Sequence, residues 1–433
     1  MVEVILLLAL AGMTHAVRSF TSGSGAGGAE LAFGFLLLAA YLAGRTLNRF
    51  GMPKLTGYLV VGVVSGASVL ALVGKGMTGS LTIVNHVATC ILGLTAGGEL
   101  NLKRVAPLMG TLRAMTVFGV VTTMFALAAL LFVMRPFLPV FDNLTFGQSV
   151  VVCGLLGVAL AAQSPSVVMA LLSETRADGP LSRVVLATVV VADLVVVVVY
   201  SLVAAVTSSL MGGGASATGT LLSIGWELFG SMAFGVLIGV VIGAFLRYVD
   251  QGAAMFALLV CVVVAEIGGH VDLDPLIVML AAGVWLENFS RAKASKLLRG
   301  FEAAELPVFL VFFALGGVSL DLGAMWSTLV PVLLLVLARG AMFYFGCRTA
   351  CARTYADPAI AKYGWTGLVP QAGLSFVLVA VIRQTFPTFG DSAAMLLLSV
   401  VGINLLVAPV MLRLALVKTN EAGKRAEHAF AEH

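Results

Sequence analysis

Residues 184–206 read VVLATVVVADLVVVVVYSLVAAV and carry a single charged side chain, Asp193. A helix needs about 20 apolar residues to cross the hydrocarbon core of a bilayer, so this stretch is long enough to span a membrane. An ionised carboxylate near the middle of a span costs about 3 kcal/mol or more, and a residue kept there despite that cost is by default a functional residue. The alternative is an aspartate paired permanently with a neighbour, and Arg339, also near the middle of an apolar span, is the obvious partner.

The rest of the chain has the same apolar character. Of its 433 residues, 60% are hydrophobic and 11% are charged, and the mean hydropathy is +1.08, which excludes an ordinary soluble domain. Backbone polar groups must be satisfied internally in lipid, and no alternating segments of about ten residues suggest a closed barrel, so the spans are predicted to be helices. Thirteen strong spans are expected, beginning near residues 30, 55, 81, 112, 147, 184, 221, 253, 273, 304, 326, 360 and 391.

The sequence contains no phosphate-binding loop, no metal-ligand cluster and no nucleophile triad. We therefore expect no enzyme activity and no cofactor, and nothing in the sequence points to nucleic acid. The five cysteines lie in or beside apolar segments and are interpreted as free thiols that fill space in the helix packing.

Basic residues are distributed very unevenly between the two sides that the alternating loops define. Twenty of the 25 Lys and Arg residues fall on one side and four on the other, which leaves Arg339 within a span. The positive-inside rule puts the basic side, with the C-terminus, in the cytoplasm. The chain is thus predicted to be a multi-pass protein of the inner, or plasma, membrane.

A shorter apolar run at residues 4–17 precedes the Gly-rich stretch 22–28. Three interpretations remain open for this run: a fourteenth helix that enters from the cytoplasm, an interfacial helix, or a signal peptide. The signal peptide is disfavoured because the run is preceded by Glu3 and by no basic residue.

Two of the predicted spans are interrupted near their middles. The span 147–172 contains Gln163-Ser164-Pro165-Ser166, and the span 360–384 contains Pro370-Gln371-Ala372-Gly373 followed by Ser375. A proline inside a helix removes a backbone donor and frees carbonyl groups. Each interruption alone has an ordinary kink as its alternative, but paired breaks are typical of transporters whose discontinuous helices form an ion site.

The two interrupted spans are the fifth and the twelfth of the thirteen, an offset of seven. An odd offset means that equivalent helices run in opposite directions, as an inverted repeat requires. The same offset matches the Asp193 span with the span that carries Asn404, and the fourth span with the one that carries Arg339. The predicted fold is therefore an all-α membrane protein of 13 to 14 transmembrane helices, with an inverted repeat and two broken, crossing helices.

Several short motifs, in this order and spacing, resemble the monovalent cation:proton antiporters of the Kef and NapA branch of the sodium/proton antiporters. The match runs from about residue 30 to 415, and the motifs are Pro53 to Tyr58, Gly97 to Leu100, Ala162 to Pro165, the Asp193 helix, Ala265 to Gly268, Phe312-Phe313 with Gly316 to Asp321, and Gly367 to Gly373. The corresponding division of the chain is an N-terminal apolar helix and linker at 1–29, an antiporter domain with dimerisation and core parts at 30–415, and a short cytoplasmic tail at 416–433.

The resemblance implies a homodimer in the lipid bilayer that exchanges Na⁺ or K⁺ for H⁺ by alternating access. It also implies that Asp193 binds the ion and the proton, and that Arg339 occupies the place of the family's basic residue before the second break. Gln163 or Ser164, with freed carbonyls, would supply further ligands to the cation. This chain has Ala192-Asp193 where the family usually has two polar residues, and Gln163-Ser164-Pro165 where it usually has Thr-Ser-Pro.

The departure at Ala192 predicts electroneutral exchange, because one carboxylate alternates between one proton and one cation. Arg339 does not add a second proton carrier, because a guanidinium stays protonated. Two other functions remain as alternatives: sodium-coupled symport of an organic anion, and a sensor that binds ions without transporting them. Glu266 is expected to be buried and to form a helix-packing hydrogen bond, with a role in transport as the alternative.

Overall fold

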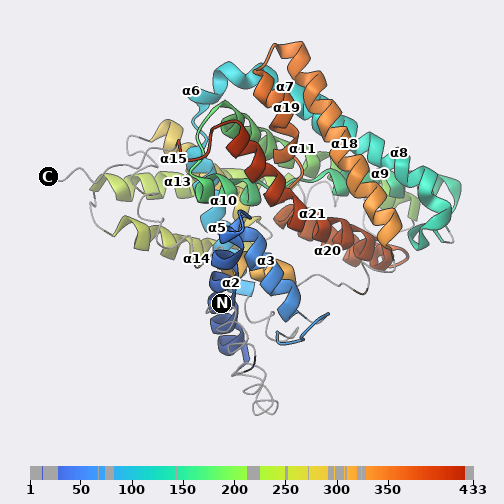
Figure 1. Ribbon diagram of the computed structural model, residues 1–433, viewed down its shortest axis with the longest axis horizontal. Helices are drawn as coiled ribbons and strands as arrows, with labels where there is room; N and C mark the ends of the chain where they lie inside the picture. The colour runs from blue at the N-terminus through green and yellow to red at the C-terminus, as the bar shows by residue number, and fades with distance from the viewer. Residues whose placement is uncertain are drawn as a thin grey trace. The chain divides into compact units, whose positions relative to one another are not determined.

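The computed structural model describes residues 28–66, 68–73, 82–142, 144–211, 225–248, 252–271, 273–290, 310–318 and 328–424, with the single residues 12, 297, 307 and 323. Throughout these described ranges the regular structure is helical, and no strand occurs (Figure 1). The apolar run at 4–17 and the stretch 425–433 lie outside them, except for Gly12. Two compact units divide the chain: unit 1 is 1–101 with 222–327, and unit 2 is 102–221 with 328–433.

Unit 1 is built from helices that approach closely at glycines. Its described elements are α2 (Gly28–Arg49), α3 (Lys54–Ser65), α5 (Thr82–Glu99), η5 (Trp226–Gly230), α13 (Ser231–Tyr248), α14 (Ala253–Val271) and α15 (Pro275–Phe289). A Cβ at Gly97 would lie 2.1 Å from the Leu280 carbonyl oxygen, and one at Gly283 would lie 2.5 Å from that of Leu94. Glycine at both positions therefore lets α5 and α15 pack backbone to backbone.

Unit 2 repeats one order of elements: a long helix, an interrupted helix and a second long helix. The first set is the continuous helical stretch Ala106–Phe137, which includes η2 (Met115–Val121) and α8 (Thr122–Met134), then α9 (Phe146–Ala161), α10 (Pro165–Thr175) and α11 (Pro180–Met211). The second set is α18 (Leu329–Thr354), α19 (Pro358–Tyr363), η6 (Gly364–Gly367), α20 (Gly373–Thr385) and α21 (Gly390–Lys418). In Figure 1, α18 runs alongside α8, which it contacts. The antiparallel relation that an inverted repeat requires stays a prediction.

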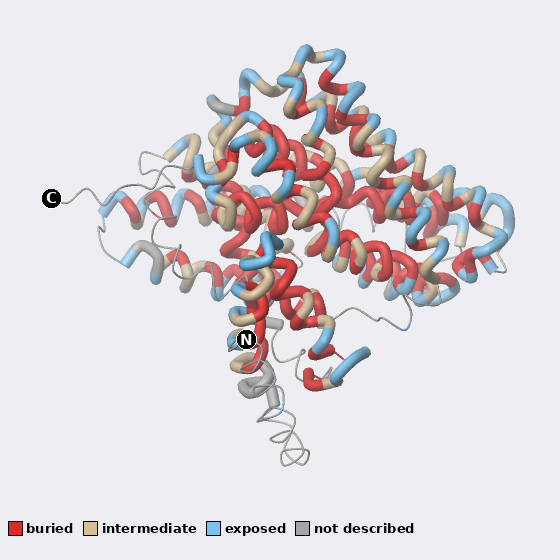
Figure 2. The backbone as a smooth tube through the Cα atoms, viewed as in Figure 1, coloured by how far each residue is buried: buried red, intermediate tan, exposed pale blue. Residues whose placement is uncertain are grey.

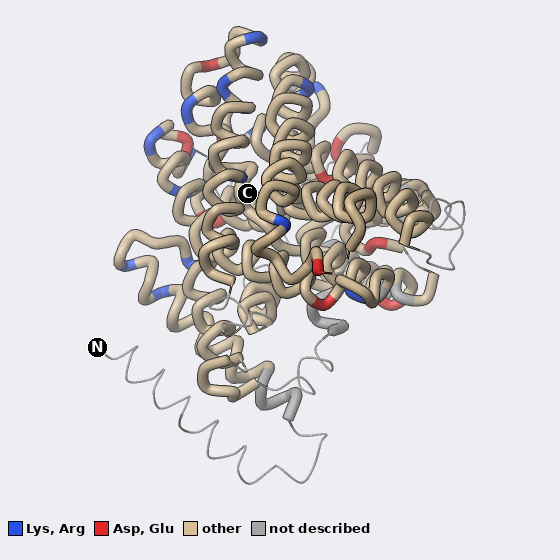
Figure 3. The backbone as a smooth tube through the Cα atoms, turned by 90° about the vertical axis from the view of Figure 1, so that its right-hand side faces the viewer, with Lys and Arg blue, Asp and Glu red and all other residues tan. Residues whose placement is uncertain are grey.

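Six of the described helices are long and apolar enough to cross a membrane, and five of them belong to unit 2. Shorter apolar helices, such as α3, α15 and α20, add to these. Figure 3 shows long stretches of helix without any charged residue. Several predicted spans begin within a residue of an observed helix, as at Lys54, Phe146, Ala253 and Gly390. The protein is thus a multi-pass membrane protein.

The interrupted helix α9–α10 is the most enclosed of the six. Its most apolar window is completely buried within the chain, whereas the corresponding window of α18 is 28% buried. Figure 2 shows the same contrast along the backbone. A capping box begins this helix, since Thr145 Oγ1 accepts from Gln148 N–H and Gln148 Oε1 accepts from Thr145 N–H. Unit 2 therefore packs around the first predicted break.

Candidate ion site at two interrupted helices

The first interruption lies where the sequence predicts it. Helix α9 ends at Ala161, residues 162–164 are not helical, and α10 begins at Pro165. Proline suits this first position because it has no N–H to leave unsatisfied. Ser164 is the N-cap, and its Oγ accepts the Val167 N–H at 3.3 Å and lies 2.9 Å from Ser166 Oγ. The start of α10 is thus satisfied locally, whereas the end of α9 needs donors from elsewhere.

Gln163 occupies the centre of this interruption and is fully buried. Its Nε2 donates to the Ala161 carbonyl at 2.7 Å, and its Oε1 has no hydrogen-bond partner among the described residues. A buried acceptor oxygen without a donor costs about 1–3 kcal/mol. Such an oxygen suits a hard monovalent cation, which binds oxygen ligands.

The second interruption follows η6, which ends at Gly367. Residues 368–372 are not helical, Pro370 is buried among them, and α20 begins at Gly373. No side chain caps α20, and the buried Ser375 Oγ in its first turn has no partner among the described residues. Each break therefore has a buried oxygen without a partner among the described residues, Gln163 Oε1 at the first and Ser375 Oγ at the second.

Gln371 joins the second interruption to the first. Its Nε2 donates to the Leu160 carbonyl at the end of α9 at 3.1 Å, and its Oε1 accepts from Asn404 Nδ2 at 2.7 Å. Both amide side chains are buried. Asn404 lies on α21, so this chain of hydrogen bonds fixes three elements against one another.

Arg339 of α18 binds the ends of both interrupted helices. Its guanidinium donates to the carbonyls of Leu160, in the last turn of α9, and Ala162, just after it, both at 2.7 Å. It also donates to Leu368 and Val369 after η6, at 3.2 and 2.6 Å. Arg339 is 1% exposed, and its charged end lies 4.7 Å from the centre of the Phe343 ring. Arg339 therefore lies at both breaks.

The charge of Arg339 is placed where two helix dipoles end. Each helix C-terminus carries about −0.5 of an elementary charge, and two of them are close to this one guanidinium. The four hydrogen bonds of Arg339 go to backbone carbonyls. None of them goes to the carboxylate of Asp193, which the sequence had suggested as a partner of Arg339. Arg339 thus serves the backbone of the breaks, and its fixed charge is balanced there.

Asp193 lies in the interior of α11 and is partly exposed, next to the buried Ala192. Helix α11 contacts both α9 and α10 and follows α10 after a short turn, so it runs back along the interrupted helix. A Cβ at Gly154 of α9 would lie 3.5 Å from Val203 Cγ1 of α11. From that contact, the end of α9 at Ala161 is about 11 Å along α9 and Asp193 about 15 Å back along α11. The helical rise therefore puts Asp193 at about the level of the first break.

One face of α11 carries polar groups that the sequence reading missed. Thr188, Ala192, Val196 and Tyr200 recur every four residues, and all are buried. Thr188 Oγ1 and the Tyr200 hydroxyl have no hydrogen-bond partner among the described residues. The available signal was the spacing of these two hydroxyls, which are twelve residues, or three four-residue steps, apart within an apolar span.

Glu266 differs from its prediction. It lies on α14 of unit 1 and is exposed within the chain, and its carbonyl oxygen is 2.9 Å from His270 Nδ1. The expected burial is wrong because Glu266 falls on the α14 face that also exposes Val262, Val263 and Ile267. No cluster of three or more His, Cys, Asp or Glu side chains that could hold a metal ion occurs within the described ranges.

Buried polar groups at two interrupted helices of a multi-pass membrane protein are typical of transporters whose ion sites lie at such breaks. The model of the family described as sodium/hydrogen exchanger, transmembrane, matches residues 34–418. The chain belongs to that family.

Two known transport proteins are similar to this chain, one in sequence and one in structure. The iron transporter MagA of Paramagnetospirillum magneticum (strain ATCC 700264 / AMB-1) is 27% identical over 385 residues, which cover 88% of this chain and 82% of the relative. The sodium proton antiporter MjNhaP1 of Methanocaldococcus jannaschii has a similar fold, with a TM-score of 0.63 and 13% identity, over 90% of this chain and 98% of that one. The fold and the family are those of transporters and not of enzymes.

Proposed function

We propose that this protein exchanges a monovalent cation, Na⁺ or K⁺, for protons by alternating access, with Asp193 carrying each in turn. The observation that supports this most is that Arg339 donates hydrogen bonds to four backbone carbonyls, two at each break. Because that positive charge is already balanced by the helix ends, it does not have to be neutralised by the carboxylate level with the first break. The carboxylate can then alternate between a proton and a cation.

The exchange rests on competition for one carboxylate. Burial in a low dielectric favours the protonated acid, while a cation held by oxygen ligands favours the carboxylate. Gln163 Oε1, the Ser164 hydroxyl and freed backbone carbonyls would contribute those ligands. Both loaded forms are neutral at this position and can cross, whereas the empty, charged form is held back by its cost in the apolar interior.

The stoichiometry follows from the residues around Asp193. Ala192 contributes no second carboxylate, and a guanidinium does not release its proton in this pH range. One cation therefore exchanges for one proton, and the cycle moves no net charge.

Unit 2 contains every residue of this site, so we take it to be the moving core part, and unit 1 to be the dimerisation part of a homodimer. The two sets of elements in unit 2 would be inverted repeats of one another. The basic side, with the C-terminus, would face the cytoplasm.

The decisive test is proton flux in proteoliposomes, followed with an internal pH dye as Na⁺, K⁺ or Li⁺ is added. We expect cation-driven proton movement that Asp193→Asn abolishes, while the variant protein still folds, because a neutral amide has no proton to exchange for a cation at this pH. Asp391→Asn removes an equal charge from an exposed ion pair with Arg383 and should leave the flux unchanged.

Other outcomes of the same assay favour other functions. Flux that requires an organic anion would favour symport, and cation binding without flux would favour a sensor. Fe²⁺ belongs among the cations tested because one relative is named an iron transporter. A flux whose rate and direction follow the membrane potential would overturn electroneutral exchange.

A further inference from the structure

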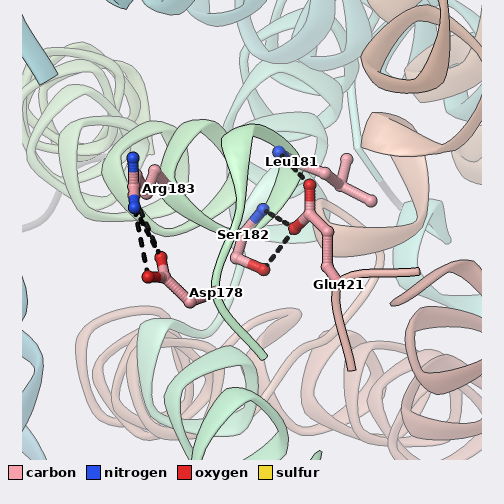
Figure 4. Close-up of polar contacts among 5 residues, drawn as sticks. All are labelled: Asp178, Leu181, Ser182, Arg183 and Glu421. Atoms are coloured by element: carbon pink, nitrogen blue, oxygen red, sulfur yellow. Dashed lines mark hydrogen bonds and ion pairs between the residues drawn. The ribbon is translucent and has the colours of Figure 1, made fainter. Parts of the chain in front are cut away.

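The chain beyond α21 folds back onto the start of α11, the helix that carries Asp193. Glu421 is 5% exposed, and its carboxylate accepts hydrogen bonds from Leu181 N–H at 2.7 Å and Ser182 N–H at 2.8 Å. The Ser182 hydroxyl donates to the same carboxylate at 2.5 Å. Figure 4 shows the carboxylate at the end of α11, with its three donors around it. We call residues 419–424 the C-terminal clasp.

Backbone contacts hold the clasp in place. The Asp178 N–H donates to the Glu421 carbonyl at 3.2 Å, and the Gly423 N–H donates to the Thr175 carbonyl at 2.9 Å. Asn420 (φ 55°) and Gly423 (φ 76°) turn the chain in the left-handed region that Asn and Gly tolerate best. The clasp is therefore an ordered structure on the turn between α10 and α11.

The turn itself is shaped to receive Glu421. Asp178 would be the ordinary candidate to cap α11, but its carboxylate binds the Arg183 guanidinium at 3.0 and 3.1 Å. Gly179 follows, and a Cβ there would lie 2.3 Å from Glu421 Cδ. No nearby side chain thus caps the start of α11, and Gly179 leaves room beside it. The carboxylate of Glu421, which is 240 residues from Leu181 in the sequence, occupies this room.

We propose that Glu421 is a positioning residue for exchange: through the clasp it fixes the start of α11 and thereby the depth of Asp193 beside the first break. This inference rests on the proposed function. Asp193 is eleven residues beyond Ser182 on one continuous helix, about 16 Å along its axis, so a shift of the helix start moves the carboxylate as well. Glu421 follows α21, whose Asn404 binds Gln371 of the second break. The clasp therefore connects the helix tied to one break with the helix that bears the acid.

The test combines hydrogen exchange of the full chain in detergent with cation-driven proton flux in proteoliposomes. In Glu421→Ala, we expect the amides of Leu181 and Ser182 to exchange at least tenfold faster. The half-saturating cation concentration should rise at least threefold at equal protein in the membrane. Glu421→Asp keeps a carboxylate and should show smaller increases in both the amide exchange rate and the half-saturating concentration. Lys424→Ala, which alters an exposed side chain in the same clasp, should change neither.

Gly179→Ala tests the clasp independently, because the added Cβ would collide with the hydrogen-bonded side chain of Glu421. It should reproduce Glu421→Ala, and the double variant should be no worse than Glu421→Ala alone, since the collision has then been removed. Faster exchange with an unchanged half-saturating concentration would reduce Glu421 to a stabilising cap and overturn the proposal, as would additive effects in the double variant. Absence of cation-driven flux from the unaltered protein would instead refute the proposed function, while the exchange data would still show whether the clasp holds α11.

Discussion

Arg339 and Glu421 each satisfy backbone groups at helix ends, Arg339 at C-terminal ends and Glu421 at an N-terminal end. Arg339 gives hydrogen bonds to carbonyls at the C-terminal ends of α9 and η6, and Glu421 takes them from amides at the N-terminal end of α11. Each charge complements the helix dipole that it meets. Arg339, however, serves two helices in the middle of apolar segments, whereas Glu421 serves one helix at a turn.

This difference separates the charges that satisfy helix ends from a charge that lies within a helix. A helix end in the apolar interior has no water to satisfy it, so its partner has to be permanent, and a guanidinium that keeps its proton suits that role. A helix end at a turn tolerates a weaker partner. Asp193 lies within a helix and not at an end, so its charge is not required to satisfy a helix terminus.

The largest effect is expected from Arg339→Leu. The substitution removes the Arg339 donor from four buried carbonyls, of which that of Leu160 keeps a second bond, from Gln371. It should lower the free energy of unfolding by about 3–5 kcal/mol. Thermal unfolding in detergent would measure this. The stability of Arg339→Lys should fall between those of the unaltered protein and Arg339→Leu, because an ammonium has three donors and cannot reproduce the geometry of the guanidinium donors.

The matched control is Arg383→Gln, which removes an exposed guanidinium that binds the exposed Asp391 and should change stability by less than about 1 kcal/mol. Equal losses at Arg339 and Arg383 would contradict the view that the interior helix ends depend on Arg339.

A smaller effect is expected where the two breaks are joined by amides. Gln371→Ala and Asn404→Ala should each lower the free energy of unfolding by about 1–3 kcal/mol, because each leaves a buried polar group unpaired. The double variant should be less destabilised than the sum, since both changes remove the same 2.7 Å hydrogen bond. A double-mutant cycle by thermal unfolding measures the coupling, and strict additivity would show that the amides act separately.

The sequence predicted the breaks well because proline acts locally. Pro165 and Pro370 mark the interruptions whatever surrounds them, and apolar runs bounded by polar residues located most helix starts. The carbonyls that Arg339 binds could not be predicted, since they come from two segments brought together only in the folded unit. Glu421 gave no local signal at all, because it stands in a polar segment after the last span.

The smallest effect is expected at Ser164, which completes the comparison because it caps a helix start within the interior by a local contact. Ser164→Ala removes the bond from Val167 N–H, and loss of an N-cap costs about 1 kcal/mol. Ser164→Thr keeps the hydroxyl and should retain most of the stability, as thermal unfolding would show. If Ser164→Ala were as damaging as Arg339→Leu, the start of α10 would depend on this cap as strongly as the end of α9 depends on Arg339. The division between permanent charges at interior C-terminal ends and weaker partners elsewhere would then have to be given up.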